Sequence, residues 1–552
     1  MRNALTAVAG LACIAVFCVR GERAVTHTAP TFDEAVHLTA GYSYWRTGDF
    51  RINRETPPLM KLLWALPLLA TDRPPFQPDP EQLEQNDIWR LGDAFLYESP
   101  LDFRAMLYPA RRVNLAVGAA LVALIGWWAW RLWSRAAGVT GSALAALDPN
   151  LLGQSAVLST DVGLTLFGTA AVYALWEYAA APRRSWFLAA GICFGLALAT
   201  KYSATVIVFA CGLSTVGFVL AGGSFALPAT PIPSTRRARL GQLLPAAVRL
   251  GLIAVAVILP IYFVWHALDW PRGFRQQLGR NEAEPPKYFL NGEISTQGWW
   301  WYFPETLMLK TPAGTLILAL LAGLKWRSFS RRDVAYVLGP PMAFVLVMMA
   351  TRLNIGLRVI LPAYPLLWLL AARVASLGAG PYSRGLACLA VVVGIALPTL
   401  LDTDRNGQSL SYFNGIVTGR AEGHHYLGDS NIDWGQGLHA LSAKLQELGN
   451  PVIYFSYAGT ARPEAYGIRY EQLPGWGTFR PAPGERVDLT GRIVLAVSVS
   501  NLQGTYLQDP TTYHWLRERT PISRTDDSIW LFDITGDPES VERVKRLTQK
   551  SP

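Results

Sequence analysis

The chain carries little charge for its length. Only 16% of its 552 residues are Asp, Glu, Lys or Arg, whereas ordinary globular proteins have about 25%. Half of the residues, 51%, are hydrophobic, and the mean hydropathy is +0.21. These values exclude a wholly soluble enzyme. The 20 Trp, 21 Tyr and 22 Phe exclude a disordered chain, because disordered chains are poor in aromatic residues. The remaining class is a polytopic membrane protein.

Cysteine is also scarce, and the basic excess is dispersed. The five cysteines all lie inside apolar runs, which excludes a disulfide framework and a cysteine metal cluster. The net charge is +9, but there is no basic stripe interleaved with aromatic residues of the kind that nucleic-acid-binding proteins have. Most of the excess falls on turns between apolar runs, where Lys and Arg accumulate on the cytoplasmic side of membrane proteins. We therefore expect no nucleic-acid partner.

About eleven apolar runs are long enough to be transmembrane helices, which need roughly 20 residues each. The first resembles a secretory signal but lacks a small-x-small cleavage site after Cys18, so we interpret it as an uncleaved anchor. The predicted spans are 4–19, 113–133, 137–156, 161–180, 186–200, 203–222, 245–268, 306–324, 334–350, 358–376 and 385–401.

The positions of Lys and Arg predict the orientation of these spans. Five basic turns, at 131–135, 183–184, 236–239, 325–332 and 373–384, would all be cytoplasmic if the N-terminus is inside. The first loop, the 269–305 loop and the C-terminal tail then lie outside. We predict a multi-pass protein of the bacterial inner (plasma) membrane, with a transmembrane domain over 1–402 that includes an outer loop at 20–112.

The tail over 403–552 has ordinary polarity and is predicted to be a small extracytoplasmic α/β domain. Leucines at helical spacing predict a helix over 434–448, and apolar β-branched runs predict strands at 452–457 and 493–499.

Acidic residues at the predicted outer ends of spans are the first candidates for chemistry, because charges near a membrane are costly. Asp33 and Glu34 stand about ten residues after the first span, and Asp161 stands at the start of the fourth. Asp33 and Glu34 have a structural alternative, since Thr31 and Asp33 can cap a helix and Glu34 can favour its dipole. Capping by one carboxylate leaves the other free, so both interpretations stay open.

Three basic residues at outer positions run against the cytoplasmic bias. Lys201 and Arg358 stand at outer span ends, and Lys310 follows a Trp-rich run. Such residues can reach to the interface as anchors, or they can bind a lipid phosphate, to which Arg offers bidentate donors and Lys a point charge. The diproline Pro57-Pro58 either starts a plain helix or fixes a turn that positions Glu55 and Lys61 near the membrane surface.

Taken together, these motifs resemble those of a known family. In chain order they are Asp33-Glu34, Pro57-Pro58-Leu-x-Lys61, Thr160-Asp161, Thr200-Lys201-Tyr-Ser, Gly292-Glu-x-Ser before Tyr302-Phe-Pro, Asn354-Ile-Gly-x-Arg358-x-x-Leu-Pro, and Asp429-Ser-Asn-Ile-Asp-Trp-Gly-Gln436. The order resembles that of the phospholipid-carrier-dependent glycosyltransferases of the GT-C fold, which include protein O-mannosyltransferases and the aminoarabinose transferase that modifies lipid A.

The resemblance implies transfer of a sugar from a polyprenyl-phosphate carrier to an acceptor hydroxyl, on the outer face and with inversion. It implies that Asp33 is the general base, supported by Glu34, and that Asp161 is a second acidic residue of the site. Basic residues would hold the donor phosphate, first Lys201 and Arg358, then Lys61 and Lys310.

A divalent metal is an option rather than an expectation, because its use varies in the family. Glu55 corresponds to a metal-binding carboxylate of the aminoarabinose branch. Thr56 stands where that branch has a phosphate-binding lysine, and the mannosyltransferases have His before the diproline.

The sequence leaves the substrates open. By resemblance the sugar is a hexose such as mannose, and a protein, a lipid or a glycan would serve as acceptor equally well. A transporter or flippase of lipid-linked sugars is the main alternative, although its sites would lie near mid-bilayer in repeated halves. A scaffold that displays the C-terminal domain is a third, but it leaves the charged residues unexplained.

Overall fold

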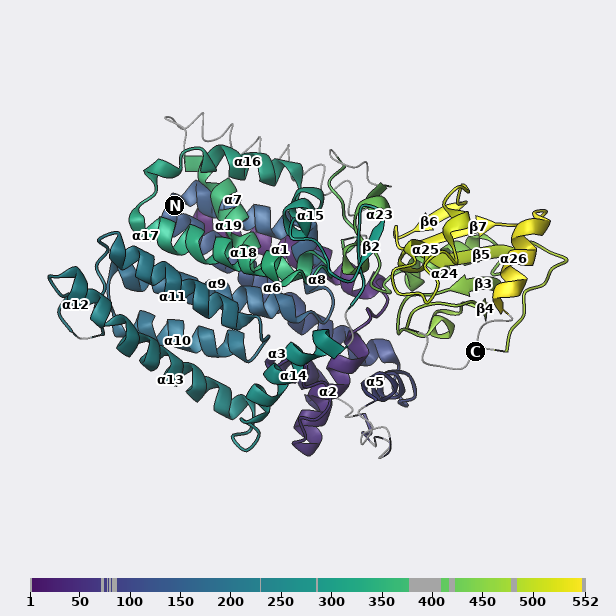
Figure 1. Cartoon of the computed structure of the whole chain (residues 1–552), viewed down its shortest axis with the longest axis horizontal. Helices are drawn as coiled ribbons and strands as arrows, with labels where there is room; N and C mark the ends of the chain where they lie inside the picture. Colours follow the sequence, from purple (N-terminus) through teal and green to yellow (C-terminus); the bar gives the residue numbers. More distant parts are fainter. Residues whose placement is uncertain are drawn as a thin grey trace.

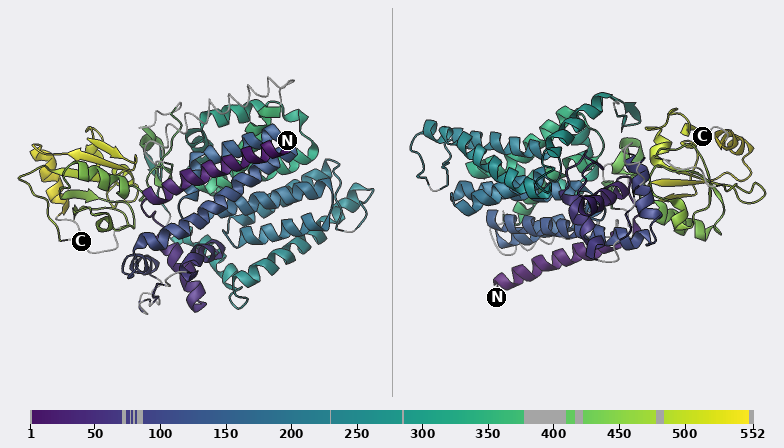
Figure 2. Two further views of the ribbon diagram at one scale, coloured as in Figure 1. Left: turned by 180° about the vertical axis from the view of Figure 1, so that it is seen from behind. Right: turned by 90° about the horizontal axis from the view of Figure 1, so that it is seen from below.

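The computed structural model describes residues 2–70, 74–76, 78, 81, 87–228, 230–283, 286–376, 409–415, 422–477 and 484–548. The predicted eleventh span, 385–401, lies outside this part of the chain. A body of long, nearly lengthwise helices makes up most of the molecule, and a sheet-containing part stands at one end of it (Figures 1 and 2).

Apolar helices form the body. Five described segments are long and apolar enough to cross a membrane: 4–27, 103–132, 236–261, 331–351 and 357–376. Two bent pairs raise the number of candidate spans to seven. The helices of the body are α1 (Arg2–His27), α6 (Phe103–Leu132), α7 (Arg135–Leu147), α8 (Pro149–Ser155), α9 (Thr160–Ala180), α10 (Arg184–Leu198), α11 (Ala204–Leu220), α12 (Arg236–Gly241), α13 (Leu243–Ile261), α15 (Tyr302–Lys310), α16 (Ala313–Gly323), α17 (Arg331–Asp333), α18 (Gly339–Thr351) and α19 (Tyr364–Arg373).

The predicted count of eleven spans is therefore confirmed only in its coarser form, as a body of apolar helices. The run predicted at 137–156 is broken, because Asp148 accepts hydrogen bonds from the N–H groups of Asn150 and Leu151 and so starts a new helix at Pro149. The run predicted at 306–324 bends by 115° where Thr311 and Pro312 separate α15 from α16. Proline lacks an N–H group and favours such a break.

Shorter helices connect the body to the sheet-containing part. The predicted outer loop contains α2 (Glu34–Thr47), α3 (Leu59–Ala70) and α5 (Ile88–Tyr97), and α14 (Asp269–Ala283) lies close by (Figure 1). Helices α2 and α3 approach so closely at Gly41 that a Cβ atom there would overlap the carbonyl oxygen of Lys61. A hairpin of β1 (Tyr288–Leu290) and β2 (Glu293–Ser295) follows, with an Asn-Gly turn in which both residues have positive φ.

The C-terminal part contains a five-stranded mixed sheet in the order β4-β3-β5-β7-β6. Strand β3 (Ile453–Ser456) is parallel to β4 (Tyr470–Gln472) and β5 (Val494–Ser498), and β7 (Ile529–Asp533) is antiparallel to β5 and β6 (Ser523–Thr525). Short helices accompany the strands: α23 (Gly423–Tyr426), α24 (Leu438–Glu447), α25 (Val499–Gln503) and α26 (Pro538–Thr548). The strands predicted at 452–457 and 493–499 are confirmed, and the predicted helix begins at Leu438 rather than at 434.

The outer loop and the C-terminal part contact each other directly. The N–H groups of Ala29 and Phe32 donate to the carbonyl oxygens of Gln436 and Trp434, each at 3.0 Å. A membrane cannot lie between groups that share hydrogen bonds, so the two segments lie on the same side of it. That this is the extracytoplasmic side stays a prediction.

Candidate functional site

Asp33 and Arg358 form the first ion pair of the site. Asp33 lies just before α2, and Arg358 lies in the 3₁₀ segment η3 (Leu357–Ala363). The Nη1 group of Arg358 donates to Oδ2 of Asp33 at 3.3 Å, and the side chains are 17% and 28% exposed. The capping alternative for Asp33 is not observed, since its carboxylate makes no capping hydrogen bond to α2. Both charged groups are thus partly accessible and paired with each other.

Glu34 has a structural position instead. It is fully buried and pairs with Arg111 of α6, whose Nη2 and Nε donate to the carboxylate at 2.6 and 2.8 Å. The carboxylate also accepts hydrogen bonds from the N–H groups of Thr31 and Leu158, both at 2.8 Å. Glu34 therefore ties the turn that carries Asp33 to α6 and to the segment before α9, which is a supporting role.

Asp161 and Lys201 form the second ion pair. Lys201 Nζ donates to Asp161 Oδ1 at 2.6 Å. Asp161 lies in the first turn of α9 and is almost fully buried, whereas the Lys201 side chain is 26% exposed. The position of Lys201 is thus explained by a specific partner rather than by anchoring at an interface alone.

Electrostatics join the two pairs into one cluster. Besides Asp33, the carboxylates of Asp429 and Asp161 attract the Arg358 guanidinium. Its carbon also lies 4.3 Å from the centre of the Trp434 ring, a cation–π contact. Arg358 Nε is buried and has no hydrogen-bond partner. We call Asp33, Asp161, Lys201 and Arg358 the four-charge cluster. Its members come from the turn before α2, from α9, from the turn before α11 and from η3, and all four are among the residues that the sequence predicted for the site. Their roles stay a prediction.

His37 lies near Asp33, and the sequence alone did not identify it as a residue of the site. It lies one helical turn after Asp33 in α2 and is 8% exposed. Burial lowers the pKa of His37 to about 4, and Asp33 partly opposes this effect. Its Nδ1 atom is buried without a hydrogen-bond partner. The four-residue spacing from Asp33 on a helix was the available signal.

Residues of the C-terminal part also reach the cluster. Asp429 has a positive φ of 56°, and its carboxylate accepts a short hydrogen bond from the Tyr506 hydroxyl. Burial raises the pKa of Tyr506 well above its ordinary value. The nearby Asp433 is buried as well, and burial raises its pKa to about 7. The motif 429–436 drew attention to this region through the family resemblance, but no residue of the motif was assigned a role from the sequence.

Lys61 and Lys310 are withdrawn from the predicted phosphate site. Lys61 Nζ is buried and donates to the carbonyl oxygens of Asn53 and Thr56, both at 2.7 Å, and to Tyr44 Oη at 3.0 Å. Lys310 Nζ, also buried, donates to the carbonyl oxygens of Leu410 and Asn431, at 2.9 and 2.5 Å. Both ammonium groups hold the backbone together inside the protein, where a lipid phosphate has no access.

Glu55 gains no support as a metal ligand. Within the described residues, one set of three His, Cys, Asp or Glu side chains has converging ligand atoms, namely Glu422, His424 and His425. Glu55 is not in that set, and it lies close enough to Lys61 to attract that ammonium. A metal at Glu55 stays a prediction.

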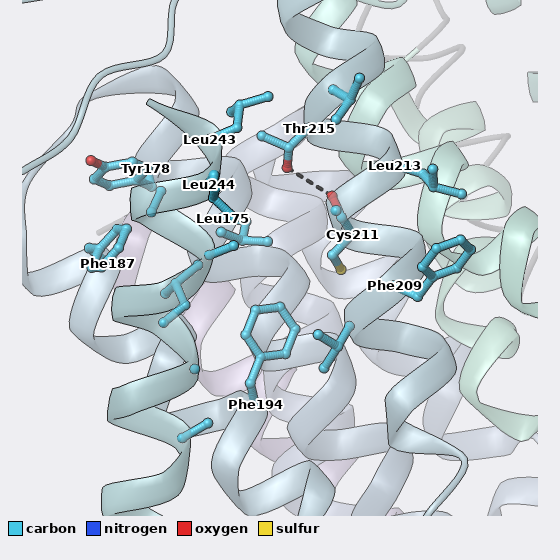
Figure 3. A pocket seen from close by; sticks show the side chains of 18 of the residues that line it. Leu175, Tyr178, Phe187, Phe194, Phe209, Cys211, Leu213, Thr215, Leu243 and Leu244 are labelled. Carbon is cyan, nitrogen blue, oxygen red and sulfur yellow. Dashed lines mark hydrogen bonds between the residues drawn. The ribbon is translucent and has the colours of Figure 1, made fainter. Parts of the chain in front are cut away.

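A large apolar cavity lies away from the four-charge cluster. It has a volume of about 440 Å³ and is lined almost entirely by apolar side chains of α9, α10, α11 and α13, among them Leu175, Phe194, Phe209 and Leu244 (Figure 3). The hydrogen bond drawn there is from Thr215 to the backbone oxygen of Cys211 at 2.8 Å. No Asp, Glu, Lys, Arg or His lines this cavity, and its titratable lining residues are Tyr178 and Cys211.

Comparisons with known proteins agree with the fold and the motifs. Residues 12–220 match the family model described as "Dolichyl-phosphate-mannose-protein mannosyltransferase". This range contains Asp33, Asp161 and Lys201 and ends before Arg358. The comparison with curated proteins returned no match.

Solved structures extend the likeness to most of the chain. The structure of ArnT from Cupriavidus metallidurans bound to undecaprenyl phosphate has a TM-score of 0.50 and 14% identity, and the match covers 95% of this chain and 97% of that one. The Archaeoglobus fulgidus oligosaccharyltransferase in complex with Zn and sulfate has a TM-score of 0.45 and 11% identity, with 72% and 53% covered. The Saccharomyces cerevisiae protein O-mannosyltransferase Pmt1-Pmt2 complex bound to the sugar donor has a TM-score of 0.33 and 17% identity, with 49% and 34% covered.

The family match and the ArnT likeness confirm the resemblance to the GT-C glycosyltransferases that the motifs indicated. At 14% identity, the likeness to ArnT shows the fold alone.

Proposed function

We propose that this protein is a membrane glycosyltransferase that moves a sugar from a polyprenyl-phosphate carrier to a hydroxyl group of an acceptor, on the outer face of the membrane and with inversion at the anomeric carbon. The observation that carries the proposal is the four-charge cluster. It brings together two carboxylates and two cations from segments far apart in the chain, and three of these side chains, those of Asp33, Lys201 and Arg358, are partly exposed.

The two kinds of charge suit the two halves of such a reaction. The acceptor must lose a proton, and a carboxylate within hydrogen-bond reach can take it. The leaving group is a lipid phosphate, and cations that are already in place stabilise the negative charge that develops on it. We assign the first role to Asp33 and the second to Arg358 and Lys201.

The step balances without a further reactant. The acceptor oxygen attacks the anomeric carbon from the face opposite the phosphate and forms the new glycosidic bond. The bond between the anomeric carbon and the phosphate oxygen breaks, and its electron pair leaves with the lipid phosphate. The acceptor proton passes to the Asp33 carboxylate. One displacement inverts the configuration.

The two ion pairs indicate which contacts must break when the donor binds. Arg358 and Lys201 are each engaged by a carboxylate, so a donor phosphate competes with Asp33 and Asp161 for them. Because the phosphate brings its own negative charge, it can take over the guanidinium and ammonium hydrogen bonds. Asp33 is then free to face the acceptor.

The sugar and the acceptor belong to the proposal as well. The description of the matching family names a dolichyl-phosphate-mannose donor and protein acceptors, and the ArnT structure contains undecaprenyl phosphate. We propose a hexose such as mannose on a polyprenyl phosphate. Protein, lipid and glycan acceptors all present the hydroxyl group that this chemistry needs.

Binding of undecaprenyl phosphate to the purified full chain tests the donor site. We expect the wild-type protein to bind undecaprenyl phosphate and Arg358→Ala to bind it more weakly. In a transfer assay, Arg358→Ala should lose about 2–4 kcal/mol of transition-state stabilisation. Arg358→Lys should restore part of the function, because it keeps the charge but loses the bidentate geometry. Arg352→Ala, which removes an exposed arginine six residues earlier, is the matched control.

Mass spectrometry of glycans, lipids and proteins from cells with and without the chain would identify the acceptor. A product that appears only with the chain, and disappears in Arg358→Ala, supports the proposal. A wild-type protein that moves intact lipid-linked sugar across vesicles without cleaving it would instead support the transporter alternative. Wild-type affinity in Arg358→Ala would overturn the phosphate assignment.

A further inference from the structure

The motif 429–436 connects the C-terminal part to both members of the first ion pair of the four-charge cluster, Asp33 and Arg358. We call these eight residues the bridging loop. Its backbone begins at Asp429, which has a positive φ, and ends just before α24. The loop lies between the sheet-containing part and the helical body, and its contacts run in both directions.

Toward the body, the loop holds the residues that directly precede the two charges of the first ion pair. The carbonyl oxygen of Trp434 accepts the N–H of Phe32, the neighbour of Asp33, at 3.0 Å. Asn431 Oδ1 accepts the N–H of Leu357, the neighbour of Arg358, also at 3.0 Å. One short segment thereby fixes the backbone on both sides of a contact between residues 325 positions apart.

Close packing reinforces the second of these attachments. Ser430 Oγ donates to the carbonyl oxygen of Ile355 at 2.7 Å. Gly356 has a φ of 121°, and a Cβ atom at this position would overlap the Ser430 hydroxyl. Glycine is required there, both for the backbone conformation and for the close approach of the loop.

Toward the sheet, the loop is anchored by buried polar groups. The Asp433 carboxylate accepts the N–H groups of Gly435 and Ser500, at 3.2 and 3.1 Å. The Tyr457 hydroxyl, next to the end of β3, donates to the carbonyl oxygen of Gly435 at 2.6 Å. The sheet therefore supplies a rigid base for the loop.

Trp434 makes a direct side-chain contact with a charge of the cluster. It is 6% exposed, and the Arg358 guanidinium lies over its ring. Arg358 also pairs with Asp33 through one 3.3 Å contact, and the carboxylates of Asp429 and Asp161 attract it. Because its Nε has no hydrogen-bond partner among the described residues, the ring supplies a flat surface that limits where the guanidinium can go.

From these contacts we propose that the bridging loop is a positioning element of the active site, in which Trp434 holds the Arg358 guanidinium in place for the donor phosphate. The C-terminal part is then a structural component of the catalytic site rather than a separate accessory. Trp434 and Asn431 are positioning residues, since they act through Arg358 and Asp33. The inference rests on the proposed function, because it assigns Arg358 to the donor phosphate.

Substitution of Trp434 in the full-length protein tests this role. We expect Trp434→Leu to weaken binding of undecaprenyl phosphate about tenfold, as expected for loss of a desolvated cation–π contact, to raise KM for the lipid-linked donor and to lower kcat. Trp434→Phe keeps an aromatic face and should restore most of the affinity. Trp515→Leu is the matched control, because Trp515 contacts Arg519 in the same C-terminal part at 5.4 Å, away from the cluster.

If Trp434 had only a structural role, Trp434→Leu would give a different result. A destabilised protein would contain fewer active molecules, but those that are folded would keep the wild-type KM and affinity. Asn431→Ser is the second variant, and it should lower kcat by loosening the backbone before Arg358 even if Trp434→Leu folds poorly.

Wild-type binding and kinetics in both Trp434→Leu and Asn431→Ser would overturn the inference and leave the proposed function intact. A wild-type protein that binds no undecaprenyl phosphate and transfers no sugar would instead overturn the proposed function itself.

Discussion

Asp33 and Arg358 are separated by 325 positions in the chain and meet at 3.3 Å between side-chain oxygen and nitrogen. One stands just after the first apolar helix and the other at the start of the last described one. In the proposed reaction these are the base and a phosphate ligand, so the same contact that neutralises both residues at rest must open when a lipid phosphate arrives. The following predictions depend on this pair and its surroundings.

Replacement of Asp33 by Asn should abolish most sugar transfer without unfolding the protein. The substitution keeps the size of the side chain, and no capping hydrogen bond is lost because Asp33 makes none. Removal of a general base typically costs about 10²–10⁴-fold in rate, and transfer assays with purified protein measure it. Asp102→Asn, in the same outer loop, should be active because Asn caps a helix as well as Asp does. If Asp33→Asn transferred sugar normally and Asp161→Asn did not, Asp161 would be the base.

Replacement of Glu34 by Gln should destabilise the protein more than it impairs chemistry. The change leaves the buried Arg111 charge without its partner, and breaking a buried ion pair costs about 3–5 kcal/mol. Thermal unfolding in detergent should show a clear loss of stability. Glu22→Gln, which breaks an exposed pair with Arg112, should cost less than about 1 kcal/mol. Equal stability of the two variants would contradict the supporting role of Glu34.

Acid should destabilise the folded protein through His37. Burial lowers the pKa of His37 to about 4, while Asp33 and Glu34 raise it and Lys61 and Arg358 lower it. An unfolded histidine has a pKa near 6.5, so between these values the unfolded state binds more protons and the free energy of unfolding falls as the pH falls. The contribution is about 3 kcal/mol between pH 7 and pH 4.

Thermal unfolding as a function of pH measures this contribution. His37→Leu removes the titrating group and should lose less stability than the wild type between pH 7 and pH 4. His425→Gln, at an exposed histidine, should keep the wild-type pH dependence. If His37→Leu and the wild type had the same pH dependence, His37 would not be the group responsible.

Reporter fusions test the orientation of the chain. Fusions at Glu98 and Asn450 should give an extracytoplasmic signal, and a fusion at Arg236 should give a cytoplasmic one, because the basic turns collect on the inner side. Glu98 and Asn450 must agree with each other, since their segments share hydrogen bonds. A cytoplasmic signal at Asn450 would contradict both the orientation and the site on the outer face.

The sequence by itself determined the class of fold and most of the candidate site. Scarce charge and long apolar runs specify membrane helices whatever their packing, because burial in lipid depends on composition and length. Acidic residues at the outer ends of spans are scarce, and so Asp33 and Asp161 were identifiable in the sequence. Basic residues that oppose the cytoplasmic bias stand out as well, and so Lys201 and Arg358 were identifiable. Their order in the chain carried the resemblance to the GT-C glycosyltransferases.

Only the tertiary structure decided which charge meets which. Lys61 and Lys201 have the same chemistry and similar local patterns, yet the first is enclosed by backbone carbonyl oxygens and the second faces Asp161. Glu34 and Asp33 are neighbours, but one is buried against Arg111 and the other is partly exposed beside Arg358. The energy of a charge depends on its distance to other charges and on its access to water, and both are set by residues far away in the chain.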